Sequence, residues 1–274
     1  MSDVYEGDRI YSGGKGSGKS YNAVVDMINA LDEGRRVVTN VAIYPKRIAY
    51  YIANMWHHKI RYRSWDSIHR FARKIYNNIY LLKEDEIQKF YLYGSVNNDY
   101  IGNRLFVLDE LHLYFNARNT MKVSELLCDY LSQSRKLNDN ILILTQNINN
   151  LDIQFRRQCR HYYHWHDSHQ VSFFKWKQLF TFNPLPRFFL AREYYGGEKR
   201  NVHVGNIIRR PSKSIFALYE TKALHNSRIV DQLQARMTME RLNIEASKLL
   251  GQNNTPGASQ AVSYAPIEHY FETE

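Results

Sequence analysis

Apolar runs separated by polar segments divide the first half of the chain into short strands and longer helices. Continuous apolar, partly β-branched runs are typical of strands buried in a parallel sheet, and they occur at residues 9–12, 36–41, 104–110 and 140–147. Helices are predicted over 21–31, where apolar residues recur at helical spacing, and over 123–136. Strands that alternate with helices in this order predict an α/β fold with a central, mostly parallel sheet.

A basic, aromatic-rich stretch at residues 48–103 separates the second of these strands from the third. Its segment Trp-His-His-Lys-Ile-Arg-Tyr-Arg at 56–63 interleaves cations with rings, a pattern that proteins use to bind single-stranded nucleic acid. However, apolar residues follow the i, i+3, i+4, i+7 spacing of a helix that packs on a core, namely Ile68, Phe71, Ala72 and Ile75. Packing is the preferred interpretation of the stretch, and base stacking is the alternative.

Residues 13–20 read Gly-Gly-Lys-Gly-Ser-Gly-Lys-Ser, a complete GxxxxGK(S/T) phosphate-binding loop between the first strand and the first helix. Glycines let the backbone turn tightly and point its N–H groups at phosphate oxygens. Lys19 then reaches the β and γ phosphates, the Ser20 hydroxyl ligates Mg²⁺, and the helix N-terminus adds its dipole. The octet predicts ATP and Mg²⁺ as ligands, held by Gly13, Gly14, Lys15, Gly16, Ser17, Gly18, Lys19 and Ser20.

Polar residues follow the two apolar strands further along the chain. Asp109 and Glu110 close the run at 104–110, and ligands bind at the carboxyl ends of strands in open α/β sheets. We expect Asp109 to hold Mg²⁺ through water, and Glu110 to orient and deprotonate the attacking water. Gln146, at the end of the next strand, can hydrogen-bond both this water and the γ-phosphate; a polar residue without a role is the alternative.

Composition adds a direction for the partner. The 274 residues carry 37 Lys and Arg and a formal net charge of +10, which favours a polyanionic partner such as nucleic acid or an anionic membrane surface. Only two cysteines occur, Cys128 and Cys159, so a reducing cytosol is expected rather than a disulfide framework. No signal sequence and no apolar run of membrane-spanning length is recognisable, so we expect a soluble protein, or one held at a membrane only by partners.

The phosphate loop, the segment VLDELHLYFNAR and the segment SQSRKLNDNILILTQNINNLDIQFRRQC together resemble the zonula occludens toxin (Zot) family. This family includes the gene I assembly proteins of filamentous phages, within the FtsK/HerA-like superfamily of DNA-pumping ATPases. The resemblance covers residues 5–225, including SIFALYETKALHNS near 214–227. It implies a RecA-like (ASCE) P-loop core, with the Asp-Glu pair on a strand inserted beside the phosphate-loop strand. It also implies a homo-oligomeric ring, taken as hexameric, and ATP-driven movement of phage DNA, taken as a single-stranded genome.

The resemblance also points to an arginine that reaches the γ-phosphate of a neighbouring subunit. Arg118 falls where related sequences often carry an arginine after the acidic pair. Arg135, Arg156 and Arg157 compete with it, because each follows a predicted strand or helix closely. For each of the four, a surface salt bridge or a DNA phosphate contact is the alternative.

Residues 159–169, Cys-Arg-His-Tyr-Tyr-His-Trp-His-Asp-Ser-His, contain potential zinc ligands. In a strand, His164 and His166 share one face while Tyr163 and Trp165 share the other, and no second Cys pair completes a tetrahedral set. An aromatic, partly exposed strand is the expectation. The following Phe-rich segments, at 173–174 and 180–189, fit a β-rich appendage.

The C-terminal part departs from the filamentous-phage members, which typically continue into a membrane-spanning helix. Residues 228–250 mix apolar residues with charges and predict an amphipathic helix instead. Residues 251–260 predict a polar linker before an acidic, aromatic tail. We expect the tail to dock on a capsid or membrane assembly protein.

The predicted organisation is an ATPase core at 1–210, with the insertion at 48–103 and the β-rich appendage at 159–210. A closing segment and amphipathic helix at 211–250 and the linker and tail at 251–274 follow. The leading functional hypothesis is an ATPase that translocates viral DNA during packaging or virion assembly. It would act in the host cytoplasm, on the virion or at the periphery of the inner membrane. The alternatives are a nucleotide-gated assembly scaffold and a replication helicase.

Overall fold

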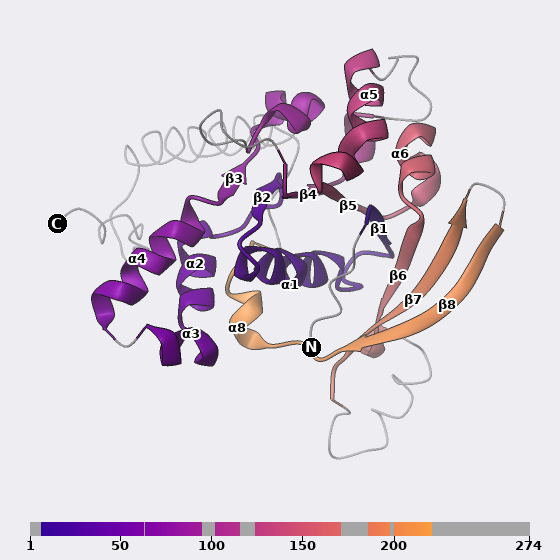
Figure 1. Ribbon diagram of the computed structural model, residues 1–274. Coiled ribbons are helices and arrows are strands. Elements are labelled where there is room, and N and C mark those ends of the chain that lie inside the picture. Colours follow the sequence, from indigo (N-terminus) through magenta and orange to yellow (C-terminus); the bar gives the residue numbers. More distant parts are fainter. Residues whose placement is uncertain are drawn as a thin grey trace, which may run out of the picture. The chain divides into compact units, whose positions relative to one another are not determined.

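The computed structural model describes residues 7–62, 64–94, 102–115, 124–170, 186–197 and 200–220, and within them the strands form one mixed sheet (Figure 1). The spatial order of the strands is β3-β2-β4-β5-β1-β6-β7-β8. The strands from β3 to β6 in this order run parallel, and β7 and β8 add an antiparallel hairpin. The strand bounds are β1 Arg9–Ser12, β2 Arg36–Thr39, β3 Ile79–Leu81, β4 Arg104–Asp109, β5 Asn140–Thr145, β6 His161–Asp167, β7 Phe189–Gly197 and β8 Arg200–Arg209.

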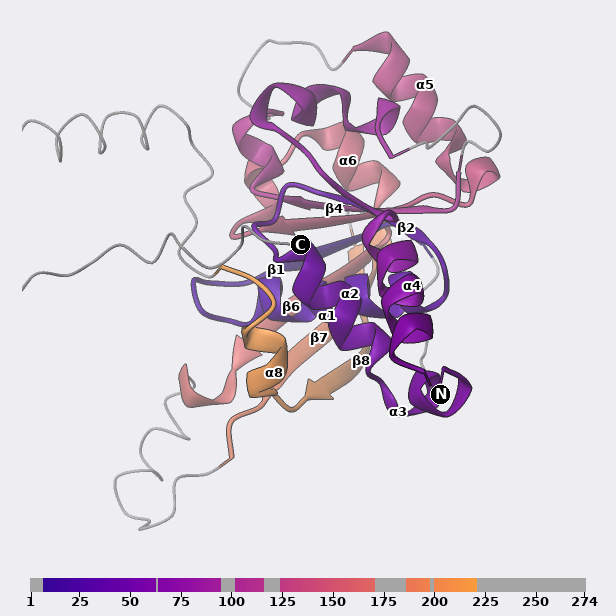
Figure 2. The same cartoon turned by 90° about the vertical axis from the view of Figure 1, so that its left-hand side faces the viewer.

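Helices cover both faces of this sheet. Their bounds are α1 Lys19–Asp32, α2 Pro45–Ala53, α3 Trp56–Arg61, α4 Trp65–Tyr76, α5 Glu125–Gln133, α6 Ile153–Gln158 and α8 Lys213–Phe216. Shorter 3₁₀ segments are η1 Glu84–Leu92, η2 Leu111–Leu113, η3 Ser134–Leu137, η4 Ile148–Asn150 and η5 Ser168–Gln170. Figure 2 shows α1, α2 and α4 on one side of the sheet and α5 and α6 on the other.

The alternation of side chains along the central strands creates two cores. On β4, Leu105 and Val107 join the cluster under α1, α2 and α4, while Phe106 and Leu108 join the cluster under η1, α5 and α6. Successive side chains of a strand point to opposite faces, so an apolar run with no polar interruption is needed where both faces are covered. The predicted strands at 9–12, 36–41, 104–110 and 140–147 are confirmed, with β2 and β5 ending two residues earlier and β4 one residue earlier.

The insertion at 48–103 is mainly helical. Ile68, Ala72 and Ile75 on α4 are buried against the core and Phe71 is partly buried, so the predicted packing face is confirmed. Pro45 is the first residue of α2. Proline is tolerated there because the N–H groups of the first turn have no acceptor within the helix, so its missing N–H costs no hydrogen bond.

The strand order corrects one implication of the family resemblance. The strand that carries Asp109 was expected beside the phosphate-loop strand, but β5 lies between β4 and β1. The register pairs Asp109 with Leu144 on one edge of β5 and Ser12 with Thr145 on the other. The reason is that β5 forms backbone ladders with both strands, so β4 has no free edge toward β1.

The segment predicted as a β-rich appendage continues the same sheet. Strand β6 pairs in parallel with β1, and the β7–β8 hairpin follows on its outer edge. Arg209, at the end of β8, forms a 3.0 Å ion pair with the buried Asp26 of α1, which ties the hairpin to the phosphate-loop helix. After α8, Leu218 and Tyr219 are also buried in the core.

The predicted amphipathic helix at 228–250, the linker and tail at 251–274, and residues 171–185 of the Phe-rich segments lie outside the described residues. Within the described part of the chain, every helix is too short or too polar to cross a bilayer.

A buried ion pair fixes the amino ends of β4 and β5. Arg104, 1% exposed, donates from Nη2 to Oδ2 of Asp139 at 2.7 Å and from Nη1 to the carbonyl oxygens of Tyr91 and Tyr93 at 3.0 and 2.8 Å. Tyr130 donates its hydroxyl to the same carboxylate at 2.8 Å. Every charged atom of this pair therefore has partners, which is the condition under which a buried pair is tolerated.

We expect Asp139→Asn to lower the free energy of unfolding by about 3–5 kcal/mol, because it leaves the Arg104 charge buried and uncompensated. Urea denaturation followed by circular dichroism measures the change. Asp129→Asn is the matched control, since Asp129 is exposed on α5, and it should shift stability by less than about 0.5 kcal/mol. Equal stabilities of the two variants would contradict this assignment.

Candidate nucleotide site

The loop between β1 and α1 has a backbone that only glycine permits at two positions. Gly13 has φ 141° and Gly18 has φ 95°, conformations that L-residues with a side chain rarely adopt. A β-carbon on Gly13 would lie 2.5 Å from the carbonyl oxygen of Trp165, and one on Gly18 would collide with the Phe189 ring. Residues of β6 and β7 therefore pack directly against the loop and leave no space for a side chain at these two positions.

The lysine of the loop is engaged by the loop itself. Lys19 donates from Nζ to the carbonyl oxygens of Gly13 at 2.7 Å and Gly14 at 3.0 Å. Burial lowers the pKa of Lys19 below its ordinary value, and the carboxylates of Asp109 and Glu110 oppose part of that effect. The ammonium group thus lies over the loop, in the field of the two acids.

Five strand ends line up along the carboxyl edge of the sheet. In spatial order they are those of β2, β4, β5, β1 and β6, with the registers Thr39–Val107, Asp109–Leu144, Ser12–Thr145 and Ser12–His164. Neighbouring strands lie about 4.8 Å apart. The phosphate-binding loop after β1 and the acids after β4 are therefore separated by roughly two strand spacings, about 10 Å. Gln146, which follows β5, lies between them.

The acids and the glutamine meet at this edge. Gln146 donates from Nε2 to Oε1 of Glu110 at 3.1 Å, and Nδ1 of His112 lies 3.1 Å from the other carboxylate oxygen of Glu110. Asn40, after β2, brackets Asp109: its Oδ1 accepts from the Asp109 N–H at 2.7 Å and its Nδ2 donates to the Asp109 carbonyl at 2.9 Å. The structure thus brings Lys19, Asp109, Glu110 and Gln146 to one edge of the sheet.

Glu110 has an unusual backbone. Its φ of 50° and ψ of 36° are left-handed, which costs about 1–2 kcal/mol for a residue with a side chain. Its N–H still donates to the Leu144 carbonyl at 3.1 Å, so the chain leaves the ladder at this residue and turns sharply. Strain of this kind is found where a side chain must be presented in one direction.

A pocket of about 230 Å³ opens beside the loop. Its lining consists of residues 16–21, Val41, Ala42 and Asp109, together with Arg187, Phe189, Phe216, Tyr219 and Glu220. Arg187 is held by Asp167 at 2.6 Å, and its guanidinium carbon lies 5.2 Å from the centre of the Phe189 ring. The lining therefore combines a polar, glycine-rich part with an aromatic part that also contains the charges of Arg187 and Glu220.

Two histidines extend the edge beyond the loop. Nδ1 of His164 lies 3.0 Å from the hydroxyl oxygen of Ser12, and the His164 and His166 rings are 4.5 Å apart. Burial lowers the pKa of both below the ordinary value of 6.5, and the positive charge of Arg192 lowers it further. Both rings are therefore neutral near pH 7. The predicted aromatic strand is confirmed as β6, with Tyr163 and Trp165 buried.

The candidate trans arginines lie in different places. Arg118 is outside the described residues. Arg135 lines a pocket with Gly7, Asn138 and Asn140, which is at the amino edge of the sheet, opposite the loop. Arg156 and Arg157 belong to α6 and do not line the pocket beside the loop.

Sequence reasoning did not single out several residues that the fold brings to the site, namely Asn40, His112, Arg187, Phe216 and Tyr219. Asn40 directly follows an apolar strand, as Gln146 does, and that signal could have identified it. Arg187 and Tyr219 lie more than 160 positions after the loop, and nothing local marks them.

A Gly-rich loop that opens a helix, two acids after a parallel strand and a further strand between them define the RecA-like class of P-loop NTPase folds. The sequence profile of the Zonular occludens toxin (Zot) family matches residues 9–226. The chain belongs to this family.

Three solved structures are similar to the chain. The N-terminal domain of zonular occludens toxin from Neisseria meningitidis is 17% identical, with coverage of 78% of this chain and 98% of that chain and a TM-score of 0.43. The genome packaging NTPase B204 from Sulfolobus turreted icosahedral virus 2, in complex with AMPPCP, is 16% identical, with coverage of 69% and 92% and a TM-score of 0.40. The RadB recombinase is 13% identical, with coverage of 76% and 89% and a TM-score of 0.42. Comparison with curated protein sequences finds no match.

We expect the free energy of unfolding to fall as the pH drops below about 6.5, because the unfolded chain takes up protons there that folded His164 and His166 refuse. Stability from these neutral rings is complete above the unfolded pKa and is lost as the pH falls toward the lowered folded values. Urea unfolding at pH 7.5 and 5.5 measures this loss.

The double variant His164→Gln/His166→Gln should lose less stability between the two pH values than the parent. His203→Gln is the control, because His203 is an exposed residue of β8, and it should keep the parent's pH dependence. The hypothesis fails if the double variant has the parent's full loss.

Proposed function

We propose that the protein is an Mg²⁺-dependent ATPase that moves viral DNA during packaging or virion assembly. The observation that carries the proposal is the convergence of Lys19, Asp109, Glu110 and Gln146 at one sheet edge, where Gln146 hydrogen-bonds Glu110 at 3.1 Å. Membership of the Zot family supports the viral setting, through the assembly proteins that the resemblance includes.

The loop is built to receive a triphosphate. The Ser17 hydroxyl oxygen is buried without a hydrogen-bond partner, which leaves a donor for an anion in the pocket. Lys19, whose ammonium group now rests on two loop carbonyls, can exchange them for phosphate oxygens. The α1 N-terminus contributes its free N–H groups and its dipole.

Hard oxygen donors are available for Mg²⁺. The Ser20 hydroxyl and the Asp109 carboxylate both line the pocket, and oxygen ligands of this kind suit Mg²⁺, which usually keeps several waters. The ion would neutralise charge that develops on the phosphates. Asn40 donates to the Asp109 carbonyl and accepts from the Asp109 N–H, and these two hydrogen bonds fix the backbone that carries the carboxylate.

Glu110 is the proposed general base. Its Oε1 accepts a hydrogen bond from Gln146, and its Oε2 lies 3.1 Å from Nδ1 of His112. Its charge acts on Lys19 of the loop. Gln146 can hold a water that the carboxylate deprotonates. Because Gln146 directly follows β5, loss of that water would change a hydrogen bond at the end of this strand. The aromatic half of the pocket, with Phe216 and Tyr219, supplies flat surfaces on which a base can stack.

The insertion is the proposed contact with DNA. Trp56 is 74% exposed and Trp65 is 64% exposed, and they lie among exposed cations at Lys59, Arg61 and Arg73. Exposed rings beside cations fit base stacking combined with phosphate contacts, and the net charge of +10 favours the same partner. A ring of subunits, with an arginine supplied in trans by Arg118, Arg156 or Arg157, belongs to this proposal.

We expect Glu110→Gln to lower the kcat of ATP hydrolysis by about 10²–10⁴-fold, because the amide cannot accept the proton of the attacking water. Its affinity for ATP should stay within about twofold, since Glu110 does not belong to the loop. Phosphate release measures kcat, and isothermal titration with Mg-ATPγS measures affinity.

Lys19→Ala is the comparison variant, and it should lose both affinity and turnover while it keeps the parent's circular dichroism spectrum. Glu110→Gln with the parent's turnover would move the base elsewhere. Undiminished turnover in Lys19→Ala would overturn the site.

A DNA motor should hydrolyse ATP faster when DNA is bound. We expect single-stranded or double-stranded DNA to raise the ATPase rate several-fold at low salt, and the Trp56→Ala/Trp65→Ala double variant to lose that stimulation while it keeps the basal rate. Tyr195→Ala is the control, because Tyr195 is an exposed residue of the β7–β8 hairpin. Phe216→Leu is not suitable as a control, because Phe216 lines the pocket.

A DNA-insensitive rate in a monomer would defeat the motor proposal. Stimulation by capsid or membrane protein alone would instead favour the scaffold, and strand separation on forked DNA would favour the helicase.

A further inference from the structure

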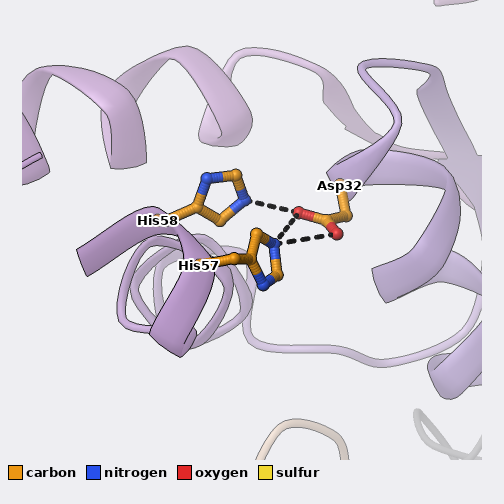
Figure 3. A group of neighbouring side chains, drawn as sticks. All are labelled: Asp32, His57 and His58. Carbon is orange, nitrogen blue, oxygen red and sulfur yellow. Dashed lines mark hydrogen bonds and ion pairs between the residues drawn. The ribbon is translucent and has the colours of Figure 1, made fainter. Parts of the chain in front are cut away.

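Three potential metal ligands converge at the end of α1 that is remote from the phosphate-type loop (Figure 3). Asp32 is the last residue of α1, and His57 and His58 are neighbours on α3. Nε2 of His58 lies 2.5 Å from Oδ1 of Asp32, and Nε2 of His57 lies 3.4 Å from Oδ1 and 3.3 Å from Oδ2. One ligand atom from each residue lies within 4.8 Å of the other two.

The surroundings of Asp32 favour a cation. A carboxylate at a helix C-terminus faces the negative end of the helix dipole, and the last turn of α1 contains no basic side chain. One imidazole is enough for an ordinary hydrogen bond to this carboxylate. Here two imidazoles approach it, each with its Nε2 atom. Two lone-pair donors and a carboxylate around one point form a ligand set, whereas simple pairing needs only one of the histidines.

The anchoring of α3 points in the same direction. This six-residue helix has no buried side chain, so packing alone gives it little hold on the core. Aromatic contacts lie at its end, where the His58 ring is 4.5 Å from the ring of Phe71 and the ring of Tyr62, the residue after α3, is 4.7 Å from it. The Phe71 contact orients His58 toward Asp32, so the protein positions the ligand before a metal arrives.

The spacing and donor type suit zinc. Zn–N and Zn–O bonds near 2.0–2.1 Å in a tetrahedron place neighbouring ligand atoms about 3.3 Å apart. The two His57–Asp32 separations, 3.3 and 3.4 Å, match this spacing, and the closer His58 pair needs to open by less than about 1 Å. Two imidazoles and one carboxylate favour Zn²⁺ or its transition-metal neighbours over Mg²⁺ and Ca²⁺, which prefer oxygen donors.

The site is reachable from solvent. The side chains of His57, Asp32 and His58 are 40%, 29% and 12% exposed, so an ion can enter and a water can fill the fourth position. We propose that Asp32, His57 and His58 bind one divalent transition-metal ion, with Zn²⁺ as the best match, which fastens α3 to the C-terminal end of α1. The site is structural, and its assignment does not depend on ATP hydrolysis.

The consequence concerns the link between two parts of the molecule. Helix α1 starts at Lys19 and ends at Asp32, a length of roughly 20 Å. The metal would attach α3, which carries the exposed Trp56, to α1. The first turn of α1 follows the phosphate-binding loop. Metal occupancy would therefore set how firmly the exposed part of the insertion follows that helix.

The test uses the full chain, stripped with EDTA and dialysed, and titrated with Zn²⁺ in a calorimeter without nucleotide. One equivalent should bind saturably and raise the Tm. The double variant His57→Gln/His58→Gln should weaken Zn²⁺ binding by at least about tenfold. Substitution of residues that only hydrogen-bond to a metal ligand already costs about 10–100-fold in metal affinity. His69→Gln is the matched control, because His69 lies on the neighbouring α4 and pairs with the Tyr50 hydroxyl instead; it should bind as the parent does.

A second measurement locates the ion. The Trp56 ring lies 5.9 Å from the His57 ring, so Cu²⁺ in place of Zn²⁺ should quench its fluorescence. Trp56→Phe should remove that component while calorimetric binding persists. If circular dichroism shows the double variant unfolded, Asp32→Asn, which keeps the shape of the side chain, takes its place and should show the same loss. Binding of Zn²⁺ by the folded variant with the parent's stoichiometry and affinity, or absence of saturable binding in the parent, would overturn the proposal.

Discussion

The position of β5 between β1 and β4 is the constraint on which the site depends. Backbone ladders on both edges of β5 set the distance and register between the loop after β1 and the acids after β4. Since the three strands are parallel, their carboxyl ends emerge at one edge, and the order of polar groups along that edge follows directly from the strand order. Gln146 can reach Glu110 only because its strand is the central one.

The local parts of this arrangement were predictable, and the pairing was not. Apolar runs that are buried on both faces identify β1, β4 and β5, and the residues after them identify Lys19, Asp109 and Gln146. No local pattern shows which strands are neighbours, so the family resemblance placed the acidic strand one position too close to the loop. The Asp32–His57 contact joins residues on two separate helices, and Arg187 reaches the pocket only through the hairpin that follows it.

The late part of the chain closes the site. Phe189, at the start of β7, occupies the space above Gly18, and Arg209, at the end of β8, is paired to Asp26 on α1. Phe189 and Arg209 are direct partners across the two strands, so the same end of the hairpin contacts both the phosphate-binding loop and its helix. The sheet and α1 thus act as one body, and the insertion is attached to that body through α2, α4 and the remote end of α1.

The hydrogen bonds of Lys19 to Gly13 and Gly14 have a consequence for how the loop would receive an anion. The ammonium group joins two carbonyls of the loop to the first turn of α1, so contacts within the chain itself fix the outline of the loop. An incoming anion exchanges one set of oxygen partners of the ammonium group for another and orders little new backbone. An anion that binds at the loop would then need a movement of the Lys19 side chain rather than a refolding of the backbone.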